Sequence, residues 1–290
     1  MNLFRATLVS ALLAVFAHAA ATDPIAYEAA VNLYKERKSA EATQAFTALA
    51  VADPANSEVQ SYLGRLALQT GGDPAVAVAH LEKAIALKPS ESRYHQQLGD
   101  AYGLSAQKAG VFSKMGWAKK CVAAYQRAVE LDPANVDAHV SLTEYYRQAP
   151  SMVGGGMDKA YAQAEKIKQL DPARGLTVLA TLYVSDKKFS EAFAIYEEQL
   201  KTTPDLYSAL YQIGRLAALS GERVERGIAT LRQCLTQTPL AGQPGHAPAN
   251  WRLGQLLEKQ NDKAGARACY EAALKIDPKF TQATESLKKL

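Results

Sequence analysis

The sequence predicts an all-α solenoid of about seven repeated helix pairs, closed by a C-terminal capping helix. Two observations predict this fold: a proline recurs after the same kind of amphipathic segment, and a small residue recurs at a fixed place within each unit. Self-similarity at a period of about 34 residues indicates a repeat architecture. The recurring prolines are Pro54, Pro89, Pro133, Pro172, Pro204, Pro239 and Pro278.

The first 21 residues do not belong to the repeat and are predicted to be a cleaved signal peptide. Arg5 is the only charge before an apolar run from Ala6 to Ala17. This run is shorter than the roughly 20 residues that span a bilayer, and the small residues around Ala19 and Ala21 suit a signal peptidase. We therefore expect an exported, periplasmic protein. A retained amphipathic anchor is the alternative, and the lack of a cysteine there argues against a lipoprotein.

Composition excludes several classes of function. Lys and Arg number 33 against 29 Asp and Glu, and the two signs are interleaved, so no basic stripe for nucleic acid is predicted. No later apolar segment approaches membrane-spanning length. Cys121, Cys234 and Cys269 are far apart and lack CxxC spacing, so we expect neither a zinc site nor a disulfide framework. A bridge between Cys234 and Cys269 remains an alternative.

Close packing of two helices explains the residue pattern within a unit. Apolar residues at i, i+3, i+4 and i+7 form one face of each helix. Glycine or alanine in the first helix lets the second helix approach closely, and an aromatic side chain of the second helix is expected to fill the remaining space. The proline then ends the second helix, because the residue before proline avoids the helical conformation. The glycines that carry this pattern are Gly64, Gly99, Gly214 and Gly254.

These motifs resemble the tetratricopeptide repeat, and the resemblance covers nearly all of the sequence after the leader. It implies a right-handed superhelix of antiparallel helix pairs, with residues 22–290 forming a single solenoid. The predicted units span about 23–56, 57–91, 92–135, 136–172, 173–206, 207–246 and 247–278, and the cap spans 279–290.

Two consecutive units carry insertions, at 104–118 and 150–157, both at the expected turn between paired helices. Such insertions often line one binding face. In the first, Phe112, Met115 and Trp117 lie among lysines and are predicted to contact a partner. The alternative is a lengthened helix pair that buries these side chains.

The second insertion contains the run from Gly154 to Gly156. A glycine-rich turn before a helix is able to bind an anion through its free N–H groups. No GxxxxGK[ST] motif is present, and Asp158 would repel a phosphate, so an ordinary loop is expected.

The resemblance implies that the first helix of each unit lines a concave groove, with ligand contacts at unit positions 2, 5, 9 and 12. These offsets lie on one helical face. Towards the C-terminus this face combines arginine with aromatic side chains, which are enriched at binding hot spots. A merely solvated face is the alternative. The predicted contact residues are Arg65, Arg93, Gln96, Asp100, Glu144, Arg147, Arg174, Tyr211, Arg215, Trp251 and Gln255.

No catalytic motif such as HExxH or GxSxG occurs in the sequence. His95 and His139 occupy the same position in successive units, where packing is expected rather than a metal site. We therefore expect a non-enzymatic scaffold without metal or cofactor, which binds a protein or peptide in its groove. The alternatives are a self-associating structural subunit of a cell-envelope assembly, with Trp117 at the contact, and an anion or lipid-headgroup binder at the glycine turn.

Overall fold

The computed structural model describes residues 22–290, so the predicted signal peptide lies outside the described residues. In this part of the protein all regular secondary structure is helical, which confirms the predicted all-α fold. No helix within residues 22–290 has the length and apolarity that crossing a bilayer requires.

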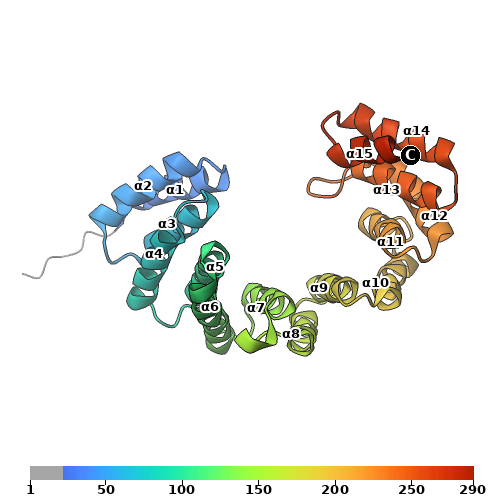
Figure 1. Ribbon diagram of the computed structural model, residues 1–290. Coiled ribbons are helices and arrows are strands. Elements are labelled where there is room, and N and C mark those ends of the chain that lie inside the picture. The colour runs from blue at the N-terminus through green and yellow to red at the C-terminus, as the bar shows by residue number, and fades with distance from the viewer. Residues whose placement is uncertain (1–21) are drawn as a thin grey trace, which may run out of the picture. The chain divides into compact units, whose positions relative to one another are not determined.

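The protein divides into two compact units, the first ending at Ser141 and the second running from Leu142 to Leu290. In the first unit, successive helices pack in hairpin-connected pairs (Figure 1). These helices are α1 (Pro24–Lys35), α2 (Ser39–Ala52), α3 (Ser57–Gln69), α4 (Pro74–Leu87), α5 (Ser92–Lys108), α6 (Val111–Leu131) and α7 (Val136–Gln148). The division between the units falls within α7.

The second unit continues the paired pattern and ends on a single helix (Figure 1). A short 3₁₀ turn, Ser151–Val153, follows α7. The helices after it are α8 (Met157–Leu170), α9 (Pro172–Ser185), α10 (Phe189–Thr202), α11 (Tyr207–Ser220), α12 (Val224–Leu235), α13 (His246–Lys259), α14 (Lys263–Ile276) and α15 (Thr281–Lys289).

The recurring prolines end helices as expected from the sequence. The residue before Pro54 closes α2 with φ −132° and ψ 85°, and the residue before Pro133 closes α6 with φ −140° and ψ 95°. This extended conformation is the one that a following proline favours. At Pro172 the same proline also begins the next helix, α9. Pro239 is different, because α12 already ends at Leu235 and a longer connection leads to α13.

Glycines allow the helices of a pair to approach closely. A Cβ atom added to Gly64 of α3 would lie only 2.6 Å from the Leu81 Cγ atom of α4, which is closer than packed carbon atoms approach. Gly214 meets Leu231 in the same way, so the predicted close approach is confirmed at both positions, but leucine takes the place of the predicted aromatic side chain. Gly99 and Gly254 face the tyrosines Tyr125 and Tyr270 of the second helices.

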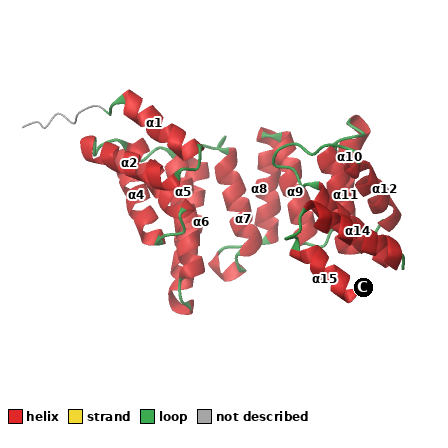
Figure 2. Cartoon of the chain, turned by 90° about the horizontal axis from the view of Figure 1, so that it is seen from above, coloured by secondary structure: helices red, strands yellow, loops and turns green. Residues whose placement is uncertain are grey.

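The first insertion lengthens both helices of the α5–α6 pair, to 17 and 21 residues. Within the first unit this hairpin extends past the end of the neighbouring α4 (Figure 2). The second insertion forms the 3₁₀ turn and a glycine loop before α8.

Candidate functional site

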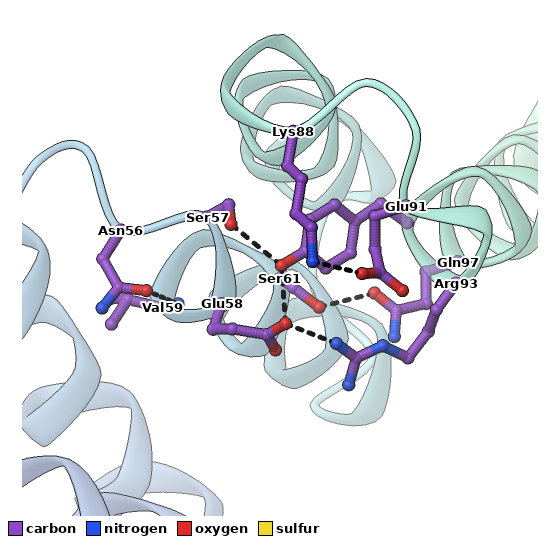
Figure 3. Close-up of polar contacts among 10 residues, drawn as sticks. Asn56, Ser57, Glu58, Val59, Ser61, Lys88, Glu91, Arg93 and Gln97 are labelled. Atoms are coloured by element: carbon purple, nitrogen blue, oxygen red, sulfur yellow. Dashed lines mark hydrogen bonds and ion pairs between the residues drawn. The ribbon is translucent and has the colours of Figure 1, made fainter.

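Polar side chains of α3 and α5 form hydrogen bonds between the two helices in the first unit (Figure 3). Arg93 Nη2 donates a hydrogen bond to Glu58 Oε1 at 2.5 Å, and the Tyr94 hydroxyl donates to the same oxygen at 2.8 Å. Ser61 Oγ donates to Gln97 Oε1 at 2.7 Å in a buried bond between the two helices. The positive charge of the predicted contact residue Arg93 is therefore matched within the protein.

Arg65 is engaged by aromatic rings rather than by a carboxylate. Its Cζ atom lies 4.6 Å from the centroid of the Tyr34 ring and 5.3 Å from that of Tyr62. Such cation–π contacts favour a guanidinium over an aromatic face. The Arg65 side chain of α3 thus packs against Tyr34 of α1, and it forms no ion pair with a carboxylate of the described residues.

Gln96 and Asp100 form a second polar group on α5. Gln96 Nε2 donates to Asp100 Oδ2 at 2.8 Å and to Ser141 Oγ at 3.1 Å, and the Tyr125 hydroxyl donates to Asp100 Oδ1 at 2.7 Å. Burial raises the pKa of Asp100 to about 6, although the bonds from Tyr125 and Gln96 oppose this rise; the nearby charge of Asp137 adds to it. These residues hold α6 and α7 against α5.

Glu144 and Arg147 pair with each other at the start of the second unit. Arg147 Nε donates to Glu144 Oε2 at 2.9 Å, and Arg147 Nη2 binds the other carboxylate oxygen. Arg147 Nη1 also donates to Ser185 Oγ at 3.2 Å. The pairing of Arg147 leaves it little capacity for a ligand carboxylate.

Arg174, the next predicted residue, lies in the first turn of α9. Its backbone N–H donates to Asp171 Oδ1 at 3.0 Å, which caps the helix.

Two arginines lie on α11 and α13, which pack against each other. Burial lowers the pKa of Arg252, and the charge of Arg215 lies close enough to lower it further. Arg252 Nη1 donates to Gln255 Oε1 at 3.0 Å, and Arg215 Nη1 donates to Gln212 Oε1 at 3.3 Å. We call Arg215 and Arg252 the arginine pair.

The arginine pair has no counter-charge. Neither guanidinium forms an ion pair with a carboxylate in the described residues. The Nε atom of Arg252 is buried without a hydrogen-bond partner. A buried donor without a partner costs about 1–3 kcal/mol. An anion bound at the solvent-accessible part of these side chains would offset positive charge that no carboxylate of the described residues balances.

Aromatic side chains surround the arginine pair. Tyr211 is buried, and its hydroxyl lies against Arg252; burial raises the pKa of Tyr211, while the charge of Arg252 lowers it. The Arg252 Cζ atom lies 4.1 Å from the Trp251 ring centroid. The Trp251 indole N–H in turn donates to Ser286 Oγ at 3.1 Å, and its ring packs edge-on against Phe280. Trp251 therefore joins the capping helix α15 to the arginine pair.

Four predicted contact residues thus lie together: Tyr211, Arg215, Trp251 and Gln255. Arg252 was missed, because it follows a predicted groove position by one residue and lies outside the unit offsets used. A sequence signal was present, since no Asp or Glu occurs from Arg226 to Leu257. An arginine in such a segment has no carboxylate three or four residues away to pair with.

The α5–α6 hairpin buries only part of its apolar insertion. The Trp117 ring packs 5.7 Å from that of Tyr102, with Lys120 Nζ 4.8 Å from the Trp117 centroid. Phe112 is fully exposed, and Met115 is 47% exposed. Phe112 is therefore the aromatic side chain at this tip that is available to a partner, while Trp117 supports the hairpin.

The glycine turn before α8 uses its own N–H groups. Gly154 and Gly156 have φ values of 92° and 151°, which favour glycine. The Gly155 amide donates to Pro150 O at 3.1 Å, and the Gly156 amide donates to Tyr146 O at 2.8 Å. These internal bonds leave no cradle of free amides in the turn.

Each of the two repeated histidines bonds a backbone carbonyl six residues earlier. His95 Nε2 lies 2.9 Å from Pro89 O, and His139 Nε2 lies 3.0 Å from Pro133 O. Both rings brace the connection that precedes their helix. Within residues 22–290 no group of three His, Cys, Asp or Glu side chains is placed to hold a metal. The cysteines are free thiols.

Family models of the tetratricopeptide repeat match residues 27–92, 103–135 and 247–280. Together with the helix-pair fold, these matches define the class: the chain is a tetratricopeptide repeat protein. No curated protein sequence matches it. As a member of this class it has the fold of a protein–protein interaction scaffold.

Solved structures with the same fold share little sequence with this protein. A tetratricopeptide repeat protein from Parabacteroides merdae is 16% identical with a TM-score of 0.61, over 91% of this chain and 96% of that chain. The C-terminal part of a repeat protein from Cytophaga hutchinsonii is 17% identical with a TM-score of 0.56, over 90% and 99%. Yeast Tom70 is 16% identical with a TM-score of 0.59, over 87% and 51%. At these identities the likeness extends to the fold alone.

Proposed function

We propose that this protein is an exported interaction scaffold that binds a carboxylate of a protein or peptide partner at the arginine pair. The observation that carries the proposal is the arginine pair itself: two arginines on packed helices that form no ion pair in the described residues, close enough for one charge to lower the pKa of the other. Arginine binds a carboxylate through two parallel hydrogen bonds, which suits an acidic side chain or the terminal carboxylate of a polypeptide.

The contrast with two other predicted arginines supports this assignment. Arg93 is already paired with Glu58, and Arg147 with Glu144. At Arg93 or Arg147 a ligand carboxylate would have to displace the internal glutamate. At the arginine pair it would have no internal carboxylate to displace. The aromatic wall of Tyr211 and Trp251 adds apolar contact beside the charge, as is common at binding hot spots.

A crosslinking experiment tests the proposal. A photo-reactive residue placed at Gln255, which hydrogen-bonds Arg252, is expected to capture a partner in cells. The same crosslinker is then combined with Arg215→Gln and Arg252→Gln. Arg232→Gln is the matched control, because Arg232 is an exposed arginine of the same unit. Mass spectrometry identifies what is captured.

The double variant is expected to lose the captured species, and the control is expected to retain it. Arg252→Lys should weaken capture at least about tenfold, because lysine cannot donate the paired bonds. Capture that survives in the double variant would refute the arginine pair as the binding site. A peptide identified in this way should bind more weakly when its acidic groups are converted to amides.

Export is supported by the leader pattern of residues 1–21 alone and has its own test. We expect a mature N-terminus between residues 20 and 22 in protein recovered from the periplasmic fraction. Mass spectrometry of the intact protein measures this directly. Uncleaved protein in the cytosolic fraction would contradict export and leave the binding proposal standing.

A further inference from the structure

The tip of the α5–α6 hairpin stands clear of the rest of the first unit. Every residue from Val111 to Gly116, more than one full turn of α6, is exposed. Val111 is 83% exposed and Phe112 103%. No atom of another part of the protein lies within 4 Å of a Cβ position built on Gly110 or Gly116. Apolar side chains are therefore exposed to solvent at this end of the hairpin.

The part of this hairpin around the tip carries only positive charge. No Asp or Glu occurs from Ala101 to Val129, a segment that contains Lys108, Lys114, Lys119, Lys120 and Arg127. Lys114 and Lys119 are exposed and form no ion pair in the described residues. At a rise of 1.5 Å per residue, Lys119 lies about 10 Å along the axis from Phe112. The cations therefore lie within about one Debye length of the apolar tip.

We propose that this tip is a contact site for an anionic membrane surface. Phe112 and Val111 would enter the interface between headgroups and acyl chains, and Lys114 and Lys119 would face the acidic headgroups. The charge of the segment is complementary to such a surface, and each lysine near an anionic bilayer adds attraction that falls off over a Debye length. One aromatic anchor with a few lysines gives reversible attachment rather than insertion.

A bilayer explains this tip better than an acidic protein does. A protein interface needs a complementary surface and packs its core as densely as a protein interior. Here Val111 and Phe112 are consecutive residues of the first turn of α6, about 100° apart around the helix axis. A fluid interface accepts side chains in any direction. The flexible stems of the lysines also allow their charges to reach headgroups while the helix end is immersed.

Vesicle co-sedimentation of the full-length protein tests the proposal. The probes are phosphatidylcholine vesicles with and without roughly one third phosphatidylglycerol. The protein is expected to bind the anionic vesicles and to dissociate as salt is raised. Phe112→Ser should weaken this binding about tenfold or more, because it removes the largest apolar side chain at the tip. Val51→Ser, which removes an exposed apolar side chain from α2, is the matched control.

Charge is tested in the same way. Lys114→Glu with Lys119→Glu should abolish binding to the anionic vesicles, while Lys35→Glu with Lys279→Glu changes the net charge equally at remote exposed sites. All variants share the same N-terminal residues, so differences among them report on the hairpin. Equal binding to neutral vesicles, or Phe112→Ser binding as tightly as its control, would overturn the proposal. So would a photo-crosslinker at position 112 that captures one protein in cells and no lipid.

Discussion

Asp100 shows how one buried side chain links packing to pH. Its pKa is raised to about 6 by burial, from an ordinary value of 3.8. Between about pH 4 and pH 6 the folded state therefore binds more protons than the unfolded state, so the free energy of unfolding falls as pH rises through this window. The stability that the folded protein gains from binding this proton is fully present below about pH 4 and is lost above about pH 6.

Asp100→Asn is expected to remove this pH dependence. The asparagine retains an acceptor for the Tyr125 hydroxyl without a buried charge, so stability at pH 7 should stay equal or rise by about 1–3 kcal/mol. Urea unfolding followed by circular dichroism between pH 4 and pH 8 measures both effects. Asp205→Asn, at an exposed carboxylate, is the control. A variant that loses the same stability at every pH would show that the charge-assisted bonds outweigh the cost of burial.

Arg252 is a proposed binding residue that lowers the stability of the unliganded protein. Without ligand it holds a buried charge near Arg215 and an unpartnered Nε–H. Arg252→Met keeps the apolar stem and removes both costs, so the unliganded protein should gain about 1 kcal/mol while partner binding is lost. Thermal unfolding against an Arg232→Met control measures the gain. A fall in the unfolding midpoint would mean that the contacts with Trp251 and Gln255 matter more than the orphan donor.

At the scale of helix pairs, replacing glycine by alanine is expected to have opposite effects on stability at Gly214 and Gly116. A Cβ on Gly214 would collide with Leu231, whereas one on Gly116 would meet nothing within 4 Å. Gly214→Ala should therefore cost about 1–3 kcal/mol through overpacking. Gly116→Ala should stabilise its helix by about 0.5–1 kcal/mol, because alanine loses less conformational freedom on folding. Chemical denaturation compares the two variants, and an equal effect at both sites would contradict the packing argument.

Helix pairs were predictable from the sequence because their determinants are local. The pre-proline residues and the small residues of the first helices act within one unit, and they confirmed the fold class. The shape of the insertion at 104–118 was not predictable, because added residues extend a helix pair or form a loop with similar composition. The partner of Arg93 was also hidden, since Glu58 lies 35 residues away in the preceding helix pair. Arg252 was missed for a related reason, because only the fold decides whether a carboxylate from elsewhere in the sequence lies near its guanidinium.

At the scale of the whole molecule, helix pairs contact their neighbours in sequence within each unit, so stability should be coupled locally there. The capping helix α15 covers the last pair through buried Ala283, the Phe280 ring against Trp251, and the Ser286 bond to the Trp251 indole. Its loss would expose the apolar side of α13 and α14. The arginine pair depends on the same contacts, because Arg252 stacks on the Trp251 ring.

Deletion of residues 279–290 should therefore destabilise the end of the second unit in a graded way. Hydrogen exchange, measured by mass spectrometry, is expected to accelerate most in α13 and α14, less in α11, and not at all in α1 to α4. Ser286→Ala serves as the graded control, because it removes only the bond to the indole. Faster exchange throughout α1 to α4 would show that the two units unfold as one cooperative body. Protection unchanged in α13 would show that the last pair needs no cap, and the arginine pair would then be held by the α11–α13 contact alone.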